Sequence, residues 1–398
     1  MSRPPPRLLS RPLFGLLLLL LAAPWAPAEA RPRQVQVAAP ERFALGPRPE
    51  QSPELRRLQE LLTQAGSGPE ALEAARAVAV FTTGEAERAV AVIDGVRTAW
   101  ADRCAAAPPC GPDPLTEPDG VEAAATLQAW RLARVDAWQA VVERAPRDPA
   151  VDLALGELAR ALEQAARRDE ALTRWTEIVR GHPDSELAAE AYTRIGDYYF
   201  DANSAFKALS AYQRATTWRD APTTPYARWK LAWCYYNVGE YRKAIELDEA
   251  LHASLRAGGP PTDPALPAAV EQDLCVFYAD NGSLDEAAVW AEREGRPGVW
   301  RCAAVRSADS LRKQGKFSSA ESVWRQLLEQ FPLDPQAPAW SQGVVACAHA
   351  LGDAARVEAE LRAARSRYAV GTPWAAANGA AAVGTAAETL HDPAQKGR

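Results

Sequence analysis

The stretch ARWKLAWCYYNVGEYRKAIEL, residues 227–247, holds the pattern on which the predicted architecture rests. Two alanines, Ala232 and Ala244, stand twelve positions apart, and Gly239 lies five positions before the second. Small residues let two antiparallel helices approach closely, and a glycine between them permits a tight turn. The stretch therefore predicts a helical hairpin, in which Leu231 and Tyr235 pack beside the small residues.

The same spacing recurs along the chain. Five pairs of a small residue and an alanine twelve positions later are present, and their first members lie 37, 36, 43 and 33 residues apart. The pairs are Ala159–Ala171, Gly196–Ala208, Ala232–Ala244, Cys275–Ala287 and Ala308–Ala320. In three of the pairs an aromatic residue follows the alanine by four positions, namely Trp175, Tyr212 and Trp324. In the last two pairs a glycine, Gly282 or Gly315, takes the turn position. A repeat of this length indicates stacked hairpins.

These hairpins resemble the tetratricopeptide repeat (TPR) over about residues 150–370. A sixth, degenerate hairpin is predicted at 338–368, where Val345 and Val357 replace the small pair. Within the family, HPDSELAAEAYTRIGDYYF (182–200) is similar to Tol-Pal-associated and outer-membrane-assembly proteins of the bacterial envelope. YARWKLAWCYYNVGEYRKAIEL (226–247) and TPWAAANG (372–379) are similar to envelope proteins of gliding-motility and secretion machines. The resemblance implies an all-α, right-handed superhelical solenoid of tandem helix-turn-helix units.

The N-terminus has the pattern of an export signal. Arg3, Arg7 and Arg11 precede an apolar run at 13–23, and Ala28-Glu29-Ala30 forms a small-x-small cleavage site. A membrane anchor is the alternative, but the run is shorter than the about 20 residues that span a bilayer. No other segment is long and apolar enough to span, so no integral membrane span is expected after cleavage.

Composition shifts divide the chain into five predicted parts. They are a signal peptide at 1–30, a flexible Pro/Arg-rich linker at 31–52, an N-terminal helical region at 53–148, the solenoid at 149–371 and a capping helix with a disordered tail at 372–398. Inside the helical region we expect helical segments at 53–64, 69–81 and 84–100, an irregular loop at 102–120 and a further helix at 121–145.

The six cysteines show no pair at zinc-ligand spacing. Cys104 and Cys110 flank a proline-containing loop, and a local disulfide between them is predicted for an oxidising compartment. The other four are expected to be helix-packing thiols, with a second disulfide among them as the alternative. Their positions are Cys234, Cys275, Cys302 and Cys347.

Composition and motifs argue against catalysis and nucleic-acid binding. The net charge is −6 and no basic block is present, whereas nucleic-acid binding needs clustered Lys and Arg. The four histidines are scattered, and no nucleotide, hydrolase or metalloprotease motif occurs. We expect no catalytic, cofactor or metal site, and no bound small molecule.

One helical face stands out as a candidate site. Tyr226, Trp229, Trp233 and Tyr236 fall on one side of a helix, opposite the residues of the small-pair face. The equivalent face of the preceding repeat carries Glu190, Asp197 and Phe200. We predict that all seven line a partner-binding groove, suited to aliphatic and arginine side chains. The alternatives are an internal packing contact and a small hydrophobic ligand.

The predicted function is a non-enzymatic protein–protein scaffold of the bacterial envelope, periplasmic or outer-membrane-associated, in an outer-membrane, motility or secretion assembly. One alternative is a periplasmic chaperone or carrier for cell-wall or lipid substrates. A second is an enzyme with its catalytic centre in residues 53–146.

Overall fold

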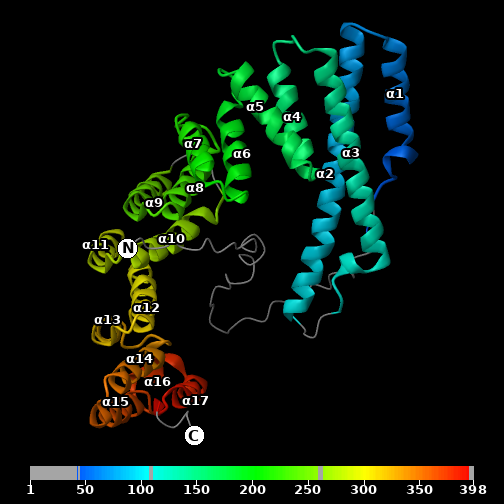
Figure 1. Cartoon of the computed structure of the whole chain (residues 1–398). Coiled ribbons are helices and arrows are strands. Elements are labelled where there is room, and N and C mark those ends of the chain that lie inside the picture. The colour runs from blue at the N-terminus through cyan, green and yellow to red at the C-terminus, as the bar shows by residue number, and fades with distance from the viewer. Residues whose placement is uncertain (1–42, 44, 107–110, 259–262, 394–398) are drawn as a thin grey trace. The chain divides into compact units, whose positions relative to one another are not determined.

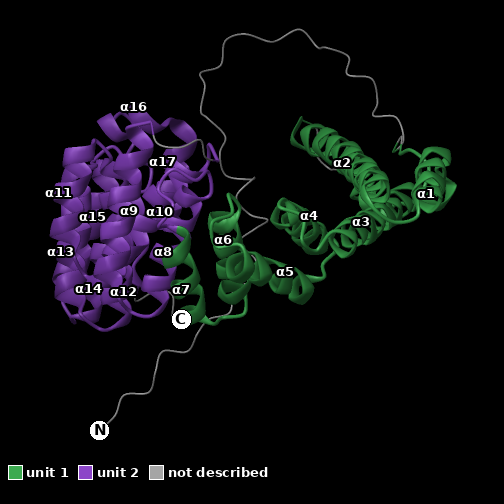
Figure 2. Cartoon of the chain, turned by 90° about the horizontal axis from the view of Figure 1, so that it is seen from above, with its two compact units in different colours: residues 1–215 green, residues 216–398 purple. Residues whose placement is uncertain are grey.

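The computed structural model describes residue 43 and residues 45–106, 111–258 and 263–393. Over these residues the chain is all-α and contains no strand, which confirms the predicted fold class (Figure 1). The chain divides into two compact units, unit 1 up to Ala215 and unit 2 from Thr216 (Figure 2). This boundary lies inside the predicted 149–371 solenoid.

Consecutive helices pair as hairpins in both units. The helices of unit 1 are α1 (Pro53–Ala65), α2 (Pro69–Ala106), α3 (Pro118–Arg144), α4 (Val151–Gln164), α5 (Arg168–Gly181), α6 (Ala188–Asp201) and α7 (Ala205–Ala215), with short 3-10 helices η1 (Pro49–Gln51) and η2 (Pro114–Thr116). The helices of unit 2 are α8 (Thr224–Asn237), α9 (Tyr241–Arg256), α10 (Leu266–Asn281), α11 (Leu284–Glu294), α12 (Pro297–Lys313), α13 (Phe317–Gln330), α14 (Ala337–Ala350), α15 (Ala354–Arg367), α16 (Pro373–Asn378) and α17 (Ala380–Thr389).

The five predicted small pairs lie where the two helices of each hairpin meet. Every member of the pairs is buried. Gly196 shows why size matters, because a Cβ built there would lie 2.6 Å from ring carbon Cε1 of Tyr212. The sixth hairpin is also present, as α14 and α15, with Val345 and Val357 buried.

The turns between paired helices use left-handed backbone. In unit 2, Gly239, Gly282 and Gly315 have φ angles of 84°, 75° and 76° at the predicted turn position. In unit 1 the equivalent residues are Ala166 and Asn203, with φ angles of 64° and 54°. The turn geometry is therefore retained in unit 1 even where the sequence lacks glycine.

The N-terminal helices differ from the prediction in their bounds. Helix α2 is continuous through Gly84 to Ala106, although the sequence predicted separate helices and a loop from residue 102. The hydroxyls of Thr82 and Thr83 donate to backbone carbonyls one turn earlier, so both side chains are accommodated within the helix. Helix α3 begins at Pro118 instead of 121.

The last residues of the predicted linker, 31–52, pack against α3. Trp130 Nε1 donates to the carbonyl of Pro47 over 3.1 Å, and Arg48 forms an ion pair with Glu122 at 2.8 Å. These contacts replace the predicted flexibility in that part of the segment. Residues 31–42 and the predicted signal peptide lie outside the described residues.

The C-terminal segment caps the last hairpin. Trp374 of α16 is buried, and its Nε1 donates to the carbonyl of Asp334 over 2.8 Å. Gln342 of α14 exchanges two hydrogen bonds with the backbone of His391. The predicted capping helix is thus two short helices, α16 and α17, and residues 394–398 lie outside the described residues.

A disulfide joins Cys275 of α10 to Cys302 of α12, with the two Cα atoms 5.6 Å apart. The expectation that both are packing thiols is wrong. They face each other because α10 and α12 are the first helices of consecutive hairpins and pack side by side. Cys234 and Cys347 are buried. The predicted partner of Cys104, Cys110, lies outside the described residues, so that pair stays a prediction.

Candidate functional site

The aromatic stripe, defined as Tyr226, Trp229, Trp233 and Tyr236, runs along α8. Pro225 lies in the first turn of the helix, where its missing N–H costs nothing. The stripe rings pack along the helix, with centroids 5.7 Å apart for Tyr226 and Trp229 and 5.2 Å apart for Trp233 and Tyr236. Tyr226 is 37% exposed, and the other three side chains are half-buried.

The stripe is hydrogen-bonded to α10 of the next hairpin and packs against it. Asp273 Oδ2 accepts hydrogen bonds from Nε1 of Trp229 over 2.5 Å and from Nε1 of Trp233 over 2.7 Å. Phe277 packs edge-on against Trp233 at 5.1 Å and stacks on Tyr236 at 4.9 Å. These contacts give three of the four stripe residues a structural role between hairpins. Their role in partner binding stays a prediction.

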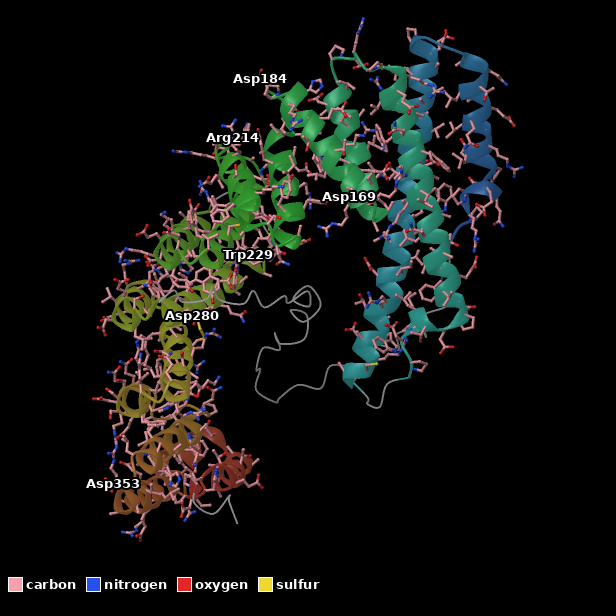
Figure 3. All side chains as sticks on the ribbon, viewed as in Figure 1. Asp169, Asp184, Arg214, Trp229, Asp280 and Asp353 are labelled. Carbon is pink, nitrogen blue, oxygen red and sulfur yellow. A yellow bond between two sulfur atoms is a disulfide. The ribbon has the colours of Figure 1, made fainter. Side chains whose placement is uncertain are left out.

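Side-chain contacts also link α8 and α10 to α12, through Asp280 and Arg306. The Tyr236 hydroxyl donates to Asp280, and Arg306 of α12 lies 3.9 Å from the same carboxylate. Burial and the bond to Asp280 raise the pKa of Tyr236, so its hydroxyl stays protonated and acts as a donor. Figure 3 labels Trp229 of α8 and Asp280 of α10. The first helices of three consecutive hairpins are therefore linked by side chains.

The electrostatics of the junction centre on Asp273, which is 8% exposed. Burial raises the pKa of Asp273 to about 6, although the two indole donors and the positive charge of Lys230 lower it. The Lys230 Nζ lies 6.0 Å from the ring centre of Tyr226 and 5.8 Å from that of Trp229. The exposed edge of the stripe is thus an aromatic surface carrying a cation.

The other predicted groove residues, Glu190, Asp197 and Phe200, lie on α6 in unit 1, whereas the stripe belongs to unit 2. Glu190 accepts two hydrogen bonds from Arg160, over 2.9 and 2.5 Å. Asp197 accepts one from the Tyr212 hydroxyl over 2.6 Å.

The α6 face therefore combines carboxylates with arginines that pair with them. Arg160 of α4 pairs with Glu190, and Arg194 of α6 lies 3.9 Å from Glu190 and 3.8 Å from Asp197. Phe200 is half-buried.

The sequence reasoning missed a buried carboxyl group that interacts electrostatically with Asp273. Asp248 of α9 is fully buried, and neither of its carboxyl oxygens has a hydrogen-bond partner. It stands four positions after Ala244, where other hairpins carry Trp175 or Tyr212. An aspartate in the aromatic packing position of a repeat was the signal that could have found it. Burial and the charge of Asp273 raise the pKa of Asp248 well above its usual value.

The described residues contain no group of three or more His, Cys, Asp or Glu side chains placed to hold a metal ion. None of the described helices is long and apolar enough to cross a membrane. What the fold presents is a row of helical hairpins with side-chain junctions between them, which is the class of helical-repeat proteins.

A comparison with family models agrees with this class. Residues 303–334, which cover most of α12 and all of α13, match the family model described as the tetratricopeptide repeat. No curated protein matches the sequence.

Two solved structures are similar at low identity. One is a tetratricopeptide repeat protein from Parabacteroides merdae, at 13% identity and a TM-score of 0.34, covering 65% of this chain and 92% of that one. The other is the Naa15/Naa10 complex bound to HypK-THB, at 17% identity and a TM-score of 0.26, covering 66% of this chain and 42% of that one.

Proposed function

We propose that the protein is an exported scaffold that binds other proteins and performs no catalysis. The observation that carries the proposal is the architecture of tandem TPR-like hairpins, one of which matches the repeat model. Stacked hairpins offer extended surface for peptides and helices of partner proteins. The setting proposed is the bacterial envelope, in an outer-membrane, motility or secretion assembly, on the strength of the resemblance in residues 182–247.

Two observations support export. The sequence begins with a basic segment, an apolar run and a small-x-small site. Cys275 and Cys302 form a disulfide, and such bonds persist mainly in oxidising compartments. Cell fractionation of the full chain with a C-terminal tag tests this part. Recovery in the periplasmic or outer-membrane fraction supports it, and recovery of uncleaved protein in the cytosol contradicts it.

The partner surface proposed is the exposed edge of the stripe around Tyr226. Trp233 and Tyr236 are engaged with α10, whereas Tyr226 keeps 37% of its surface exposed at the start of α8. Lys230 already lies near the faces of Tyr226 and Trp229. Of the aliphatic and arginine side chains predicted from the sequence, aliphatic ones therefore suit this edge better, since a second cation would meet Lys230.

Site-specific photo-cross-linking tests the surface. A benzophenone amino acid replaces Tyr226 in the full chain, and Glu246 on the exposed side of α9 serves as the control position. We expect discrete protein adducts in the envelope fraction from position 226 and none of the same mass from 246. Identical adducts from both positions, or none from 226, contradict a partner surface here. A lipid or glycan retained in native mass spectrometry would favour a carrier instead.

A further inference from the structure

The junction between α8 and α10 contains a pair of acidic groups that packing alone does not explain. Asp273 is the single acceptor for two indole N–H groups, and Asp248 lies buried on α9 with both oxygens unpartnered. A buried polar group without a hydrogen bond is costly, and a buried unpaired charge costs far more. The position of Asp248 therefore requires that its carboxyl group be neutral.

We propose that Asp248 and Asp273 form a proton-sensitive latch between α8 and α10. In its charged form, Asp273 holds Trp229 and Trp233 together through charge-assisted hydrogen bonds. When Asp273 takes up one proton from solvent, the neutral carboxyl group is a weaker acceptor, and both indoles are released to move. Asp248 keeps its proton throughout and limits the pair to one negative charge.

The burial of the two groups assigns the roles. Asp273 is 8% exposed and exchanges its proton with solvent, whereas Asp248 is fully enclosed. Burial and the charge on Asp273 raise the pKa of Asp248, so ionisation of Asp273 opposes ionisation of Asp248. The pKa of Asp273, raised to about 6 by burial, places its exchange in the mildly acidic range.

The other charged groups near α10 do not change the roles assigned to Asp273 and Asp248. The charged or titratable groups on elements packed against α10 include Lys230 on α8, Glu249 and His252 on α9, Glu286 and Arg293 on α11, and Arg301 and Arg306 on α12. Lys230 favours the charged form of Asp273. Most of the others have partners of their own: Glu249 with Arg293, His252 with Glu271, Arg301 with Asp334 and Arg306 with Asp280.

This latch would make the aromatic stripe responsive to acidification. The proposal concerns the junction itself and holds whether or not the stripe edge binds a partner. The indole of Trp374 is an internal control. Its Nε1 donates to the backbone carbonyl of Asp334, and a backbone carbonyl does not titrate.

Nuclear magnetic resonance of the indole N–H groups tests the latch. The full chain is labelled with 15N-tryptophan, and Trp229→Phe and Trp233→Phe assign the two resonances. We expect both to shift together between about pH 4 and about pH 8, with one shared midpoint near that of a carboxyl group raised to about 6. The Trp374 resonance should stay constant. Two flat titration curves, or curves that follow Trp374, overturn the proposal.

Two variants separate the carboxyl groups. Asp273→Asn should abolish the shared titration while leaving the Trp374 resonance in place. Asp248→Asn should keep it with little change of midpoint, because Asp248 is already neutral. Loss of the titration in Asp248→Asn, with the other resonances unchanged, would assign the proton to Asp248 and overturn the latch as stated. This second variant keeps the test decisive even if Asp273→Asn fails to fold.

Discussion

At the scale of single residues, the turn position of each hairpin shows how backbone geometry selects the side chain. Left-handed backbone costs an L-residue about 1 kcal/mol or more, and glycine escapes this cost. Unit 2 uses Gly239, Gly282 and Gly315 there, whereas unit 1 places Ala166 at a φ angle of 64°. Ala166 is exposed, so its side chain gains little from packing.

We therefore predict that Ala166→Gly stabilises unit 1 by up to about 1 kcal/mol, because the strain outweighs the added freedom of glycine in the unfolded chain. Hydrogen exchange of the α4 and α5 amides measures the effect. The reciprocal substitution, Gly315→Ala, meets no atom within 4 Å but keeps φ at 76°, so it should destabilise α12 and α13 by a similar amount. Stabilisation by Ala166→Gly together with destabilisation by Gly315→Ala supports the role of backbone strain at the turn. Destabilisation by Ala166→Gly contradicts it.

The close approach at Gly196 makes a second prediction at this scale. Gly196→Ala would place a methyl group 2.6 Å from Tyr212, whose ring is fully buried and whose hydroxyl bonds to Asp197. We expect a loss of about 1–3 kcal/mol in the free energy of unfolding, measured by urea denaturation. Gly95→Ala in α2 is the matched control, because it meets open space and should stabilise by about 0.5–1 kcal/mol. A neutral Gly196→Ala would show that α6 and α7 are not in close contact.

At the scale of secondary-structure elements, the disulfide fixes α10 against α12. The cross-link closes a loop with a sequence separation of 27 residues, which favours the folded state by about 2–4 kcal/mol. Replacing both Cys275 and Cys302 by alanine should therefore speed hydrogen exchange in these two helices by one to three orders of magnitude. Reductant should cause the same change in the native protein and none in the double variant. Unchanged exchange in the double variant would show that packing alone holds the helices.

The buried carboxyl group of α9 leads to a prediction about pH. The pKa of Asp248 is higher in the folded chain than the usual value of about 3.9 in an unfolded one, so folding binds a proton between these two values. Its stabilising contribution is therefore complete at low pH and is lost as the pH rises. The loss per pH unit approaches about 1.4 kcal/mol in that interval.

Comparing the native protein with Asp248→Asn isolates this effect, since the variant has no proton to lose there. We expect the free energy of unfolding of the native protein to fall relative to the variant as the pH rises from about 5 to about 8. Urea denaturation monitored on unit 2 measures the difference. A difference that is constant with pH would show that Asp248 ionises alike in the folded and unfolded states.

At the scale of the whole molecule, the sequence predicted the hairpins well and the links between them poorly. The small pairs and turn glycines specify contacts within a hairpin, where the two helices are close in sequence and the geometry is repetitive. The bonds from Trp229 and Trp233 to Asp273 cross from one hairpin to the next, over 44 and 40 residues. Helical spacing identifies the residues on one face of a helix but not what packs against that face. The sequence therefore did not decide whether the stripe is a binding surface or an internal packing contact.

The same limit explains the other differences. The bond between Cys275 and Cys302 depends on the packing of two first helices, which no local pattern reveals. Helix α2 continues through Thr82 and Thr83, whose hydroxyls bond to the helix backbone, although threonine has a low helix propensity. Asp248, in contrast, was visible in the sequence as the wrong residue type at a repeated packing position.

We propose that the exposed edge of the stripe in unit 2 binds a protein partner. The affinity of the cross-linked partner for the full chain, measured by calorimetry, tests it most directly. Tyr226→Ala should weaken binding about tenfold or more, because exposed aromatic anchors contribute a large share of interface energy, while Glu246→Ala should leave it unchanged. Equal affinities for the native protein and Tyr226→Ala, with the fold intact, would contradict the account.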